Sequence, residues 1–176
     1  KKNLKNKKFV IVVSDAITGA SEYIELSRED YINEMLATGA LPVLMKDPIC
    51  LNGARKFDGG ITDPIPVKKA YEMGAKEIVI IRTYEQGFVR KIKLENYIAA
   101  LATRTYPKIS QALKTNAAIY NAALEFINNP PNDCKIIQIC PPERLKTKRA
   151  TINHDTLKAD YKIGMNEGLK YLKNLS

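Results

Sequence analysis

Short apolar, β-branched runs alternate with amphipathic stretches along the chain. The runs at residues 9–13, 77–81 and 135–139 have the composition of strands buried on both faces. Residues 21–26 predict a further strand, which we expect to pair with the first run as a hairpin through the turn at 14–19. Residues 49–51 and 55–57 flank Asn52-Gly53, the strongest short signal for a hairpin.

Apolar residues recur at helical spacing between these runs. The pattern predicts helices near residues 27–38, 67–73, 94–103, 109–127 and 155–172, with Ser27 and Asp155 as N-caps. Because helices alternate with β-branched strands, the chain predicts an α/β fold, namely a mixed, largely parallel sheet flanked by helices. The 176 residues carry no repeat or linker, so we expect one compact unit.

The stretch from residue 55 to 74 leads from a strand through Asp58-Gly59-Gly60 and a proline-containing loop into a helix. Two glycines allow a sharp bend or a close approach of backbones, and Pro64 and Pro66 restrict the loop. Asp58 would then be held between two defined elements, which is how catalytic groups on loops are usually positioned. On the local pattern alone, however, Asp-Gly is common in turns, and the pattern favours Asp58 as an ordinary turn residue.

The net charge is +9, with basic clusters near the start of the chain and at Lys146, Lys148 and Arg149. Such a surface attracts nucleic acid or anionic headgroups, but aromatic residues do not interleave with these clusters as they do in nucleic-acid modules. We therefore interpret the lysines as a solvated surface and expect no nucleic-acid partner. Three distant cysteines form no C-x-x-C pair, which favours reduced thiols in a cytoplasmic protein and gives no zinc or redox motif. No apolar run is long enough to cross a membrane, and no secretory leader opens the sequence.

Sequence motifs for familiar catalytic machinery are absent. No serine has the glycines of a nucleophile elbow, and there is no glycine-rich phosphate loop. The single histidine, His154, lies in a stretch that predicts a polar loop. Carboxylate pairs occur at Glu29-Asp30 and at Asp58 with Asp63, but nothing in their spacing makes either a general acid/base pair. We expect no metal and no cofactor.

The order of several motifs resembles the patatin-like phospholipase family, in particular its bacterial branch. The resemblance rests on Ala37-Thr38-Gly39-Ala40-Leu41-Pro42, on Asn52-Gly53, and on Phe57-Asp58-Gly59-Gly60-Ile-Thr-Asp63-Pro64-Ile-Pro66. Three further stretches extend the resemblance over nearly the whole chain. They are Gly74-Ala75 with the strand after it, the opening strand with Asp15 to Gly19, and the tail with Pro141-Pro142 and Tyr161. Thr38 stands where the family usually has serine.

The resemblance implies a lipid acyl hydrolase with a Ser-Asp dyad and no histidine. Asp58, supported by Gly59 and Gly60, matches the family's general base, and the substrate is a lipid or another acyl ester. This chain has neither the serine elbow nor the glycine-rich oxyanion loop that precede the aspartate in the family. The resemblance therefore implies the C-terminal portion of a patatin-like domain, inactive alone, with exposed apolar surface that contacts the missing N-terminal half or a second copy.

Two functions remain open at this point. One is a lipid acyl hydrolase that acts peripherally at a membrane, with Asp58 as base and the nucleophilic serine outside this chain. The other is a non-enzymatic basic module, a degenerate or regulatory patatin-like fragment that binds anionic lipid or nucleic acid.

Overall fold

A computed structural model describes residues 7–26, 29–42, 44–45, 47–148 and 150–174. Its contacts divide the chain into two compact units, where the sequence pattern predicts one. Unit 1 comprises Lys1–Pro66 and Arg90–Glu125, and unit 2 comprises Val67–Val89 and Phe126–Ser176. That both units belong to one larger domain stays a prediction.

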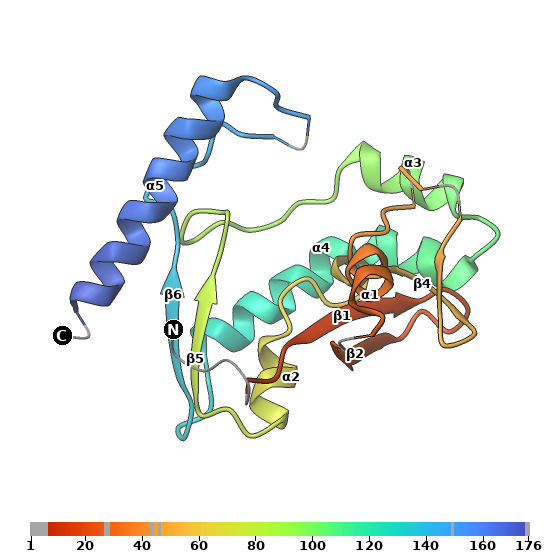
Figure 1. The fold of residues 1–176 in the computed structure, drawn as a ribbon, viewed down its shortest axis with the longest axis horizontal. Coiled ribbons are helices and arrows are strands. Elements are labelled where there is room, and N and C mark those ends of the chain that lie inside the picture. The colour runs from red at the N-terminus through yellow and green to blue at the C-terminus, as the bar shows by residue number, and fades with distance from the viewer. Residues whose placement is uncertain (1–6, 27–28, 43, 46, 149, 175–176) are drawn as a thin grey trace. The chain divides into compact units, whose positions relative to one another are not determined.

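Unit 1 contains a four-stranded sheet in the order β2-β1-β4-β3, antiparallel throughout (Figure 1). Its elements are β1 (Val10–Asp15), β2 (Ser21–Glu25), α1 (Tyr31–Thr38), β3 (Ile49–Leu51), β4 (Ala54–Asp58), the 3-10 turn η2 (Gly59–Ile61), α3 (Leu94–Ala102) and α4 (Pro107–Asn128), whose last residues fall in unit 2. The register pairs Ser14 with Ser21 on one side of β1 and with Phe57 on the other. The central strand β1 therefore fixes the end of β4, where Asp58 lies.

Alternate side chains of the unit 1 sheet enter two separate apolar clusters, as the two-residue period of a strand requires. Ile11 and Val13 of β1 pack with Ala37 of α1 and Leu51 of β3. The second cluster joins the sheet and the turn after β4 to α3 and α4: Ala16, Phe57, Ile61, Ala99, Ala100, Ile109 and Leu113. Phe57 is completely buried and meets the Tyr106 ring edge-on, with ring centroids 5.3 Å apart. The residue before Asp58 is thus anchored in the core.

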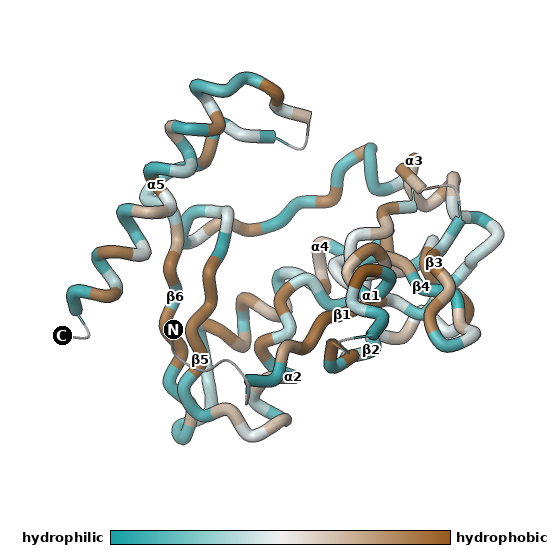
Figure 2. The backbone as a smooth tube through the Cα atoms, viewed as in Figure 1, coloured by the Kyte–Doolittle hydropathy of each residue, from teal (hydrophilic) through white to brown (hydrophobic). Residues whose placement is uncertain are grey.

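Unit 2 contains a parallel pair of strands with helices α2 and α5. Its elements are α2 (Val67–Glu72), β5 (Glu77–Ile81), β6 (Lys135–Ile139) and α5 (His154–Lys173), and the register pairs Glu77 with Lys135 through to Ile81 with Ile139. Figure 2 shows both strands as largely apolar segments. At the start of these strands, Asp133 accepts hydrogen bonds from Tyr71 at 2.8 Å and Lys76 at 2.6 Å.

The mixed α/β character and both predicted hairpins are confirmed, and β5 and β6 pair in parallel. The expectation of a largely parallel sheet is wrong for the four-stranded sheet. Connections of a few residues, such as the one at Asn52-Gly53, can only reverse the chain, whereas parallel neighbours need a long crossover.

Helix boundaries differ from the predictions at the start of two helices. Helix α1 begins at Tyr31, with Asp30 in its N-cap position, rather than near residue 27. Asn153, rather than Asp155, caps α5, because its Oδ1 accepts a hydrogen bond from Thr156 N at 2.9 Å. His154, predicted in a loop, is consequently the first residue of this helix. Several residues named in the predictions lie outside the described residues. They are the predicted cap Ser27 and, from the basic clusters, Lys1, Lys2, Lys5 and Arg149.

Candidate functional site

Asp58 ends β4 and at the same time caps the 3-10 turn that follows. Its backbone N–H donates to the carbonyl of Ala40 at 3.0 Å, which ties it to the segment after α1. Its Oδ1 accepts a hydrogen bond from the N–H of Gly60 at 2.7 Å. One carboxylate oxygen therefore has a fixed position relative to the backbone at the strand end, and the side chain is half-buried.

Glycine is required at position 59 because the backbone of the turn lies very close to the backbone of β1 there. A Cβ added there would lie 2.1 Å from the carbonyl oxygen of Val12 and 2.4 Å from its carbonyl carbon. Gly60 is less constrained, because the nearest atom to an added Cβ is Asp58 Oδ1 at 3.1 Å. The first glycine of the Asp-Gly-Gly motif thus brings the turn against β1, and the second supplies the N–H that holds the carboxylate.

The hydroxyl of Ser14, in β1, supports Asp58 together with the hydroxyl of the half-buried Thr62. Ser14 is completely buried, and its Oγ donates to the Asp58 carbonyl at 2.7 Å. The same Oγ lies 2.8 Å from Thr62 Oγ1, just after the turn. Ser14 is consequently bonded to both ends of the 3-10 turn, and a buried hydroxyl held this way is a structural group rather than an accessible nucleophile.

Asn116 of α4 holds the turn from the helix layer. Its Nδ2 donates to the carbonyls of Gly60 at 2.8 Å and Ile61 at 3.0 Å, and its Oδ1 accepts from Arg90 Nη1 at 2.9 Å. The guanidinium of Arg90 also lies over the Tyr120 ring, 3.9 Å from its centroid. The asparagine is buried, so all of these polar groups are satisfied inside the unit, as buried polar groups must be.

An ion cluster around the buried Lys56 joins three strands of the same sheet, β1, β2 and β4. Lys56 Nζ is 2.7 Å from Asp15 Oδ2 and 2.6 Å from Glu22 Oε1, and only 4% of the lysine is exposed. Asp15 Oδ1 accepts further hydrogen bonds from Thr18 N, Thr18 Oγ1 and Ile17 N. Burial alone would raise the pKa of Asp15, but the bonds from Lys56, Thr18 and Ile17 outweigh it and hold that pKa well below its ordinary value. Burial would likewise lower the pKa of Lys56, but the two carboxylates raise it.

The structure thus brings Asp58, Gly59 and Gly60 together at the end of β4. Asp63 Oδ2 accepts a hydrogen bond from the hydroxyl of Tyr23 at 2.6 Å. Asp30, of the other predicted carboxylate pair, accepts from Asn33 Nδ2 at 2.6 Å.

Three supporting residues were not predicted from the sequence: Ser14, Lys56 and Asn116. Asn116 could have been found, since it interrupts the apolar stripe of Ile109, Leu113 and Tyr120 at helical spacing, and a polar residue on a buried face needs a partner. Lys56 could have been found as a charge inside a strand next to the buried Phe57. Nothing in the sequence marks Ser14.

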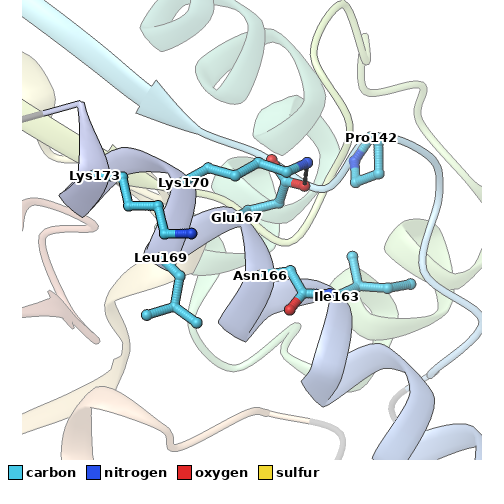
Figure 3. Close-up of a pocket in the computed structure, with 7 residues that line it drawn as sticks. All are labelled: Pro142, Ile163, Asn166, Glu167, Leu169, Lys170 and Lys173. Carbon is cyan, nitrogen blue, oxygen red and sulfur yellow. Dashed lines mark hydrogen bonds and ion pairs between the residues drawn. The ribbon is translucent and has the colours of Figure 1, made fainter.

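The described residues contain no cluster of three or more histidine, cysteine or acidic side chains that could hold a metal ion. Cys50, Cys134 and Cys140 are free thiols. None of the described helices combines the length and the apolar character needed to cross a bilayer. A groove of about 440 Å³ lies in unit 2 between Pro142 and α5, and Figure 3 shows Glu167 and Lys170 of this helix joined by an ion pair beside it.

Comparisons with known proteins found two matches. A family model described as a domain of unknown function, DUF6363, matches residues 106–176, which contain α4, β6 and α5. The chain is also 30% identical over 152 residues to an uncharacterized protein, YjjU, of Escherichia coli (strain K12). That alignment covers 82% of this chain and 41% of the relative, so the chain spans about two fifths of the length of this curated relative.

Proposed function

We propose that this chain is the C-terminal part of a patatin-like lipid acyl hydrolase, with Asp58 as the general base and the nucleophilic serine outside the chain. The observation that carries the proposal is the presentation of the Asp58 carboxylate. It stands at a strand end, with Oδ1 held by Gly60 N–H at 2.7 Å and with its loop bonded to β1 and α4. A base must be held within hydrogen-bonding reach of the proton it removes, and this loop provides such rigidity.

The fold proposed with this function is the patatin-like α/β fold, in which further strands and helices complete the two units described above. An open face of strand β5 in unit 2 supports it. Parallel sheets are normally covered on both faces, yet β5 leaves Val79 and Ile81 exposed, Ile81 by 80%. A two-stranded parallel pair therefore has apolar surface left to bury.

In the proposed reaction the carboxylate of Asp58 takes the proton of the serine hydroxyl as that oxygen attacks the ester carbonyl. The aspartic acid then returns the proton to the leaving alcohol, and water hydrolyses the acyl-enzyme by the same route in reverse. The hydrogen bond from Gly60 N–H to Oδ1 holds the carboxylate in position for this proton transfer. The oxyanion needs hydrogen-bond donors of its own, which we assign, like the serine, to segments outside this chain.

Hydrolysis of a short acyl ester by the product of the complete open reading frame tests the proposal. Asp58→Asn keeps an oxygen acceptor for Gly60 N–H but cannot take a proton, so we expect kcat to fall by about 10²–10⁴-fold. Asp63→Asn is the matched control. It removes a carboxylate that lies five positions further along the chain and is hydrogen-bonded to Tyr23, and it should change kcat by less than about threefold. Full activity of Asp58→Asn would show that the base lies elsewhere. The 176-residue chain alone should be inactive.

A second candidate function, the non-enzymatic basic module, is favoured by the net charge of +9. In that case the chain binds an anionic lipid surface or nucleic acid, and Asp58→Asn leaves both binding and the absence of hydrolysis unchanged. Binding through lysines must weaken steeply with salt. Binding that is insensitive to salt would contradict this function.

A further inference from the structure

Helix α5 carries two different stripes along its 20 residues. The stripe against its own unit is made of half-buried or buried residues at helical spacing: Thr156, Asp160, Ile163, Glu167 and Tyr171. The stripe facing away is made of large apolar residues that recur every three or four positions and are all exposed: Leu157, Tyr161, Met165, Leu169 and Leu172. Figure 2 shows α5 as a helix in which brown segments alternate with teal ones.

The exposure of this outward stripe is substantial. Tyr161 is 69% exposed, Leu172 59% and Met165 46%. Isolated apolar residues on a surface are ordinary, but a contiguous stripe along a whole helix marks an interaction surface.

The two faces of α5 carry different charged residues. Asp160 is buried and accepts a hydrogen bond from Thr147 N at 2.6 Å, and Glu167 is paired with Lys170 at 2.6 Å. Lys158 and Lys162 are exposed and lie along one edge of the apolar stripe, since they precede Tyr161 and Met165 by three residues each, a spacing that makes neighbours on a helix surface. After Asp155 in the first turn, the outward face therefore presents apolar and cationic side chains and no acidic one.

The loop before α5 extends the same charge. Arg144, Lys146 and Lys148 are exposed in it, and Ile152, just before the helix, is 87% exposed. Apolar residues flanked by lysines along one face are the features of a helix that lies in the plane of a membrane surface, with its apolar side among the acyl chains and its lysines at anionic headgroups.

We propose that the outward face of α5 is a docking surface for an anionic lipid bilayer. A second copy of the chain fits this face less well, because the face offers lysines to its partner and only Asp155 to pair with them. The exposed apolar residues of α1 and α3 carry no lysine within those helices, so the same argument does not extend to them. The inference names a surface for the peripheral membrane contact, and it holds whether or not Asp58 is a catalytic base.

Cosedimentation of the product of the complete open reading frame with vesicles tests the proposal. Vesicles of phosphatidylcholine with phosphatidylglycerol at about three to one should bind the chain at about 0.1 M salt, at least tenfold better than phosphatidylcholine alone. Met165→Gln with Leu172→Gln should weaken binding about tenfold or more, because glutamine keeps helix propensity and removes the apolar contact. The matched control is Ile98→Gln with Leu101→Gln in α3, also exposed apolar residues, which should change binding by less than about twofold.

The lysine edge is tested in the same way. Lys158→Gln with Lys162→Gln should weaken binding to the anionic vesicles about tenfold, since each lysine near such a surface contributes measurably. Lys91→Gln with Lys114→Gln removes the same charge from exposed positions elsewhere and should have a smaller effect. Circular dichroism and urea midpoints that match the parent chain show that each variant is folded.

Three results would overturn the proposal. They are no binding to anionic vesicles, equal binding to neutral and anionic vesicles, or an equal loss in the α3 and α5 variants. A concentration-dependent dimer that the α5 variant abolishes, without vesicle binding, would assign the face to a second copy instead. None of these outcomes bears on ester hydrolysis, so failure here is separate from failure of the Asp58 assignment.

Discussion

Replacement of Gly59 by alanine should destabilise unit 1 strongly, because the motif glycine is needed for packing as much as for chemistry. The new methyl carbon would lie 2.1 Å from the Val12 carbonyl oxygen. Ordinary contact begins at 3.4 Å, so the two backbones would have to separate by about 1 Å. Val12 is opposite Tyr23 in the β1–β2 ladder, and its carbonyl also accepts the hydroxyl of Thr38 at 2.6 Å.

The magnitude follows from what that movement breaks. Forcing a methyl group into a well-packed region costs about 1–3 kcal/mol. If the retreat of the Val12 carbonyl also breaks the bond from Thr38, an unsatisfied buried group adds about 1–3 kcal/mol. We therefore expect the free energy of unfolding to fall by about 2–6 kcal/mol, which is a large part of the 5–15 kcal/mol typical of a domain.

Urea denaturation followed by far-UV circular dichroism measures the effect. Gly39→Ala is the matched control, because Gly39 lies in the same unit with φ −111°. The nearest atom to a Cβ added there is the carbonyl oxygen of Leu36, at 3.9 Å, which is ordinary contact. The control should change the free energy of unfolding by less than about 0.5 kcal/mol. A loss below about 1 kcal/mol for Gly59→Ala, with an unchanged m-value, would refute the close approach of the turn to β1.

Three further outcomes are expected. Lys56→Met leaves Asp15 buried without its cation and should cost about 3–5 kcal/mol in a urea titration, against less than about 0.5 kcal/mol for the exposed Lys114→Met. The pKa of Asp15 is lower in the folded state than in the unfolded state. Its contribution to stability is therefore complete above the unfolded pKa of about 3.9, and it is lost as the pH falls toward the lower folded value. A urea midpoint that does not fall on acidification below about pH 4 would contradict the ion pair between Asp15 and Lys56. Asn116→Leu leaves the carbonyls of Gly60 and Ile61 without their donor and should cost about 2–4 kcal/mol, whereas the exposed Thr115→Ala should cost less than about 0.5 kcal/mol.

The sequence predicts those parts of the fold that depend on near neighbours. Asn52-Gly53 specifies its own hairpin, since Asn52 adopts φ 50° and Gly53 φ 77° as a two-residue turn requires. Gly74, with φ 98° just past α2, is likewise a local signal. The position of Asp58 at a strand end followed by a bend could be predicted for the same reason.

The direction of the sheet and the support of the candidate site depend on distant residues. Short turns make the pairs β1–β2 and β3–β4 antiparallel. The pair β1–β4 is also antiparallel, although β2, α1 and β3 lie between these strands in sequence, and no local pattern gives the direction of such a pair. Ser14 and Asn116 reach the Asp58 turn across 44 and 56 residues of sequence. No local pattern reports such contacts, although a polar residue within an apolar helical stripe indicates that some partner exists.

The long-range contacts change how Asp58 itself is interpreted. An aspartate that serves only as a turn residue needs one local bond, here the bond to Gly60 N–H, and any turn of this type provides it. Ser14 and Asn116 fix the same short segment from β1 and from α4, which is more constraint than a connection between a strand and a helix requires. Because such constraint stabilises a fold as well as a carboxylate, rate and stability must be measured on one variant. Asp58→Asn keeps an acceptor for Gly60, so a turn residue predicts that both stay near the parent values, whereas a general base predicts a loss of kcat with little change in the free energy of unfolding.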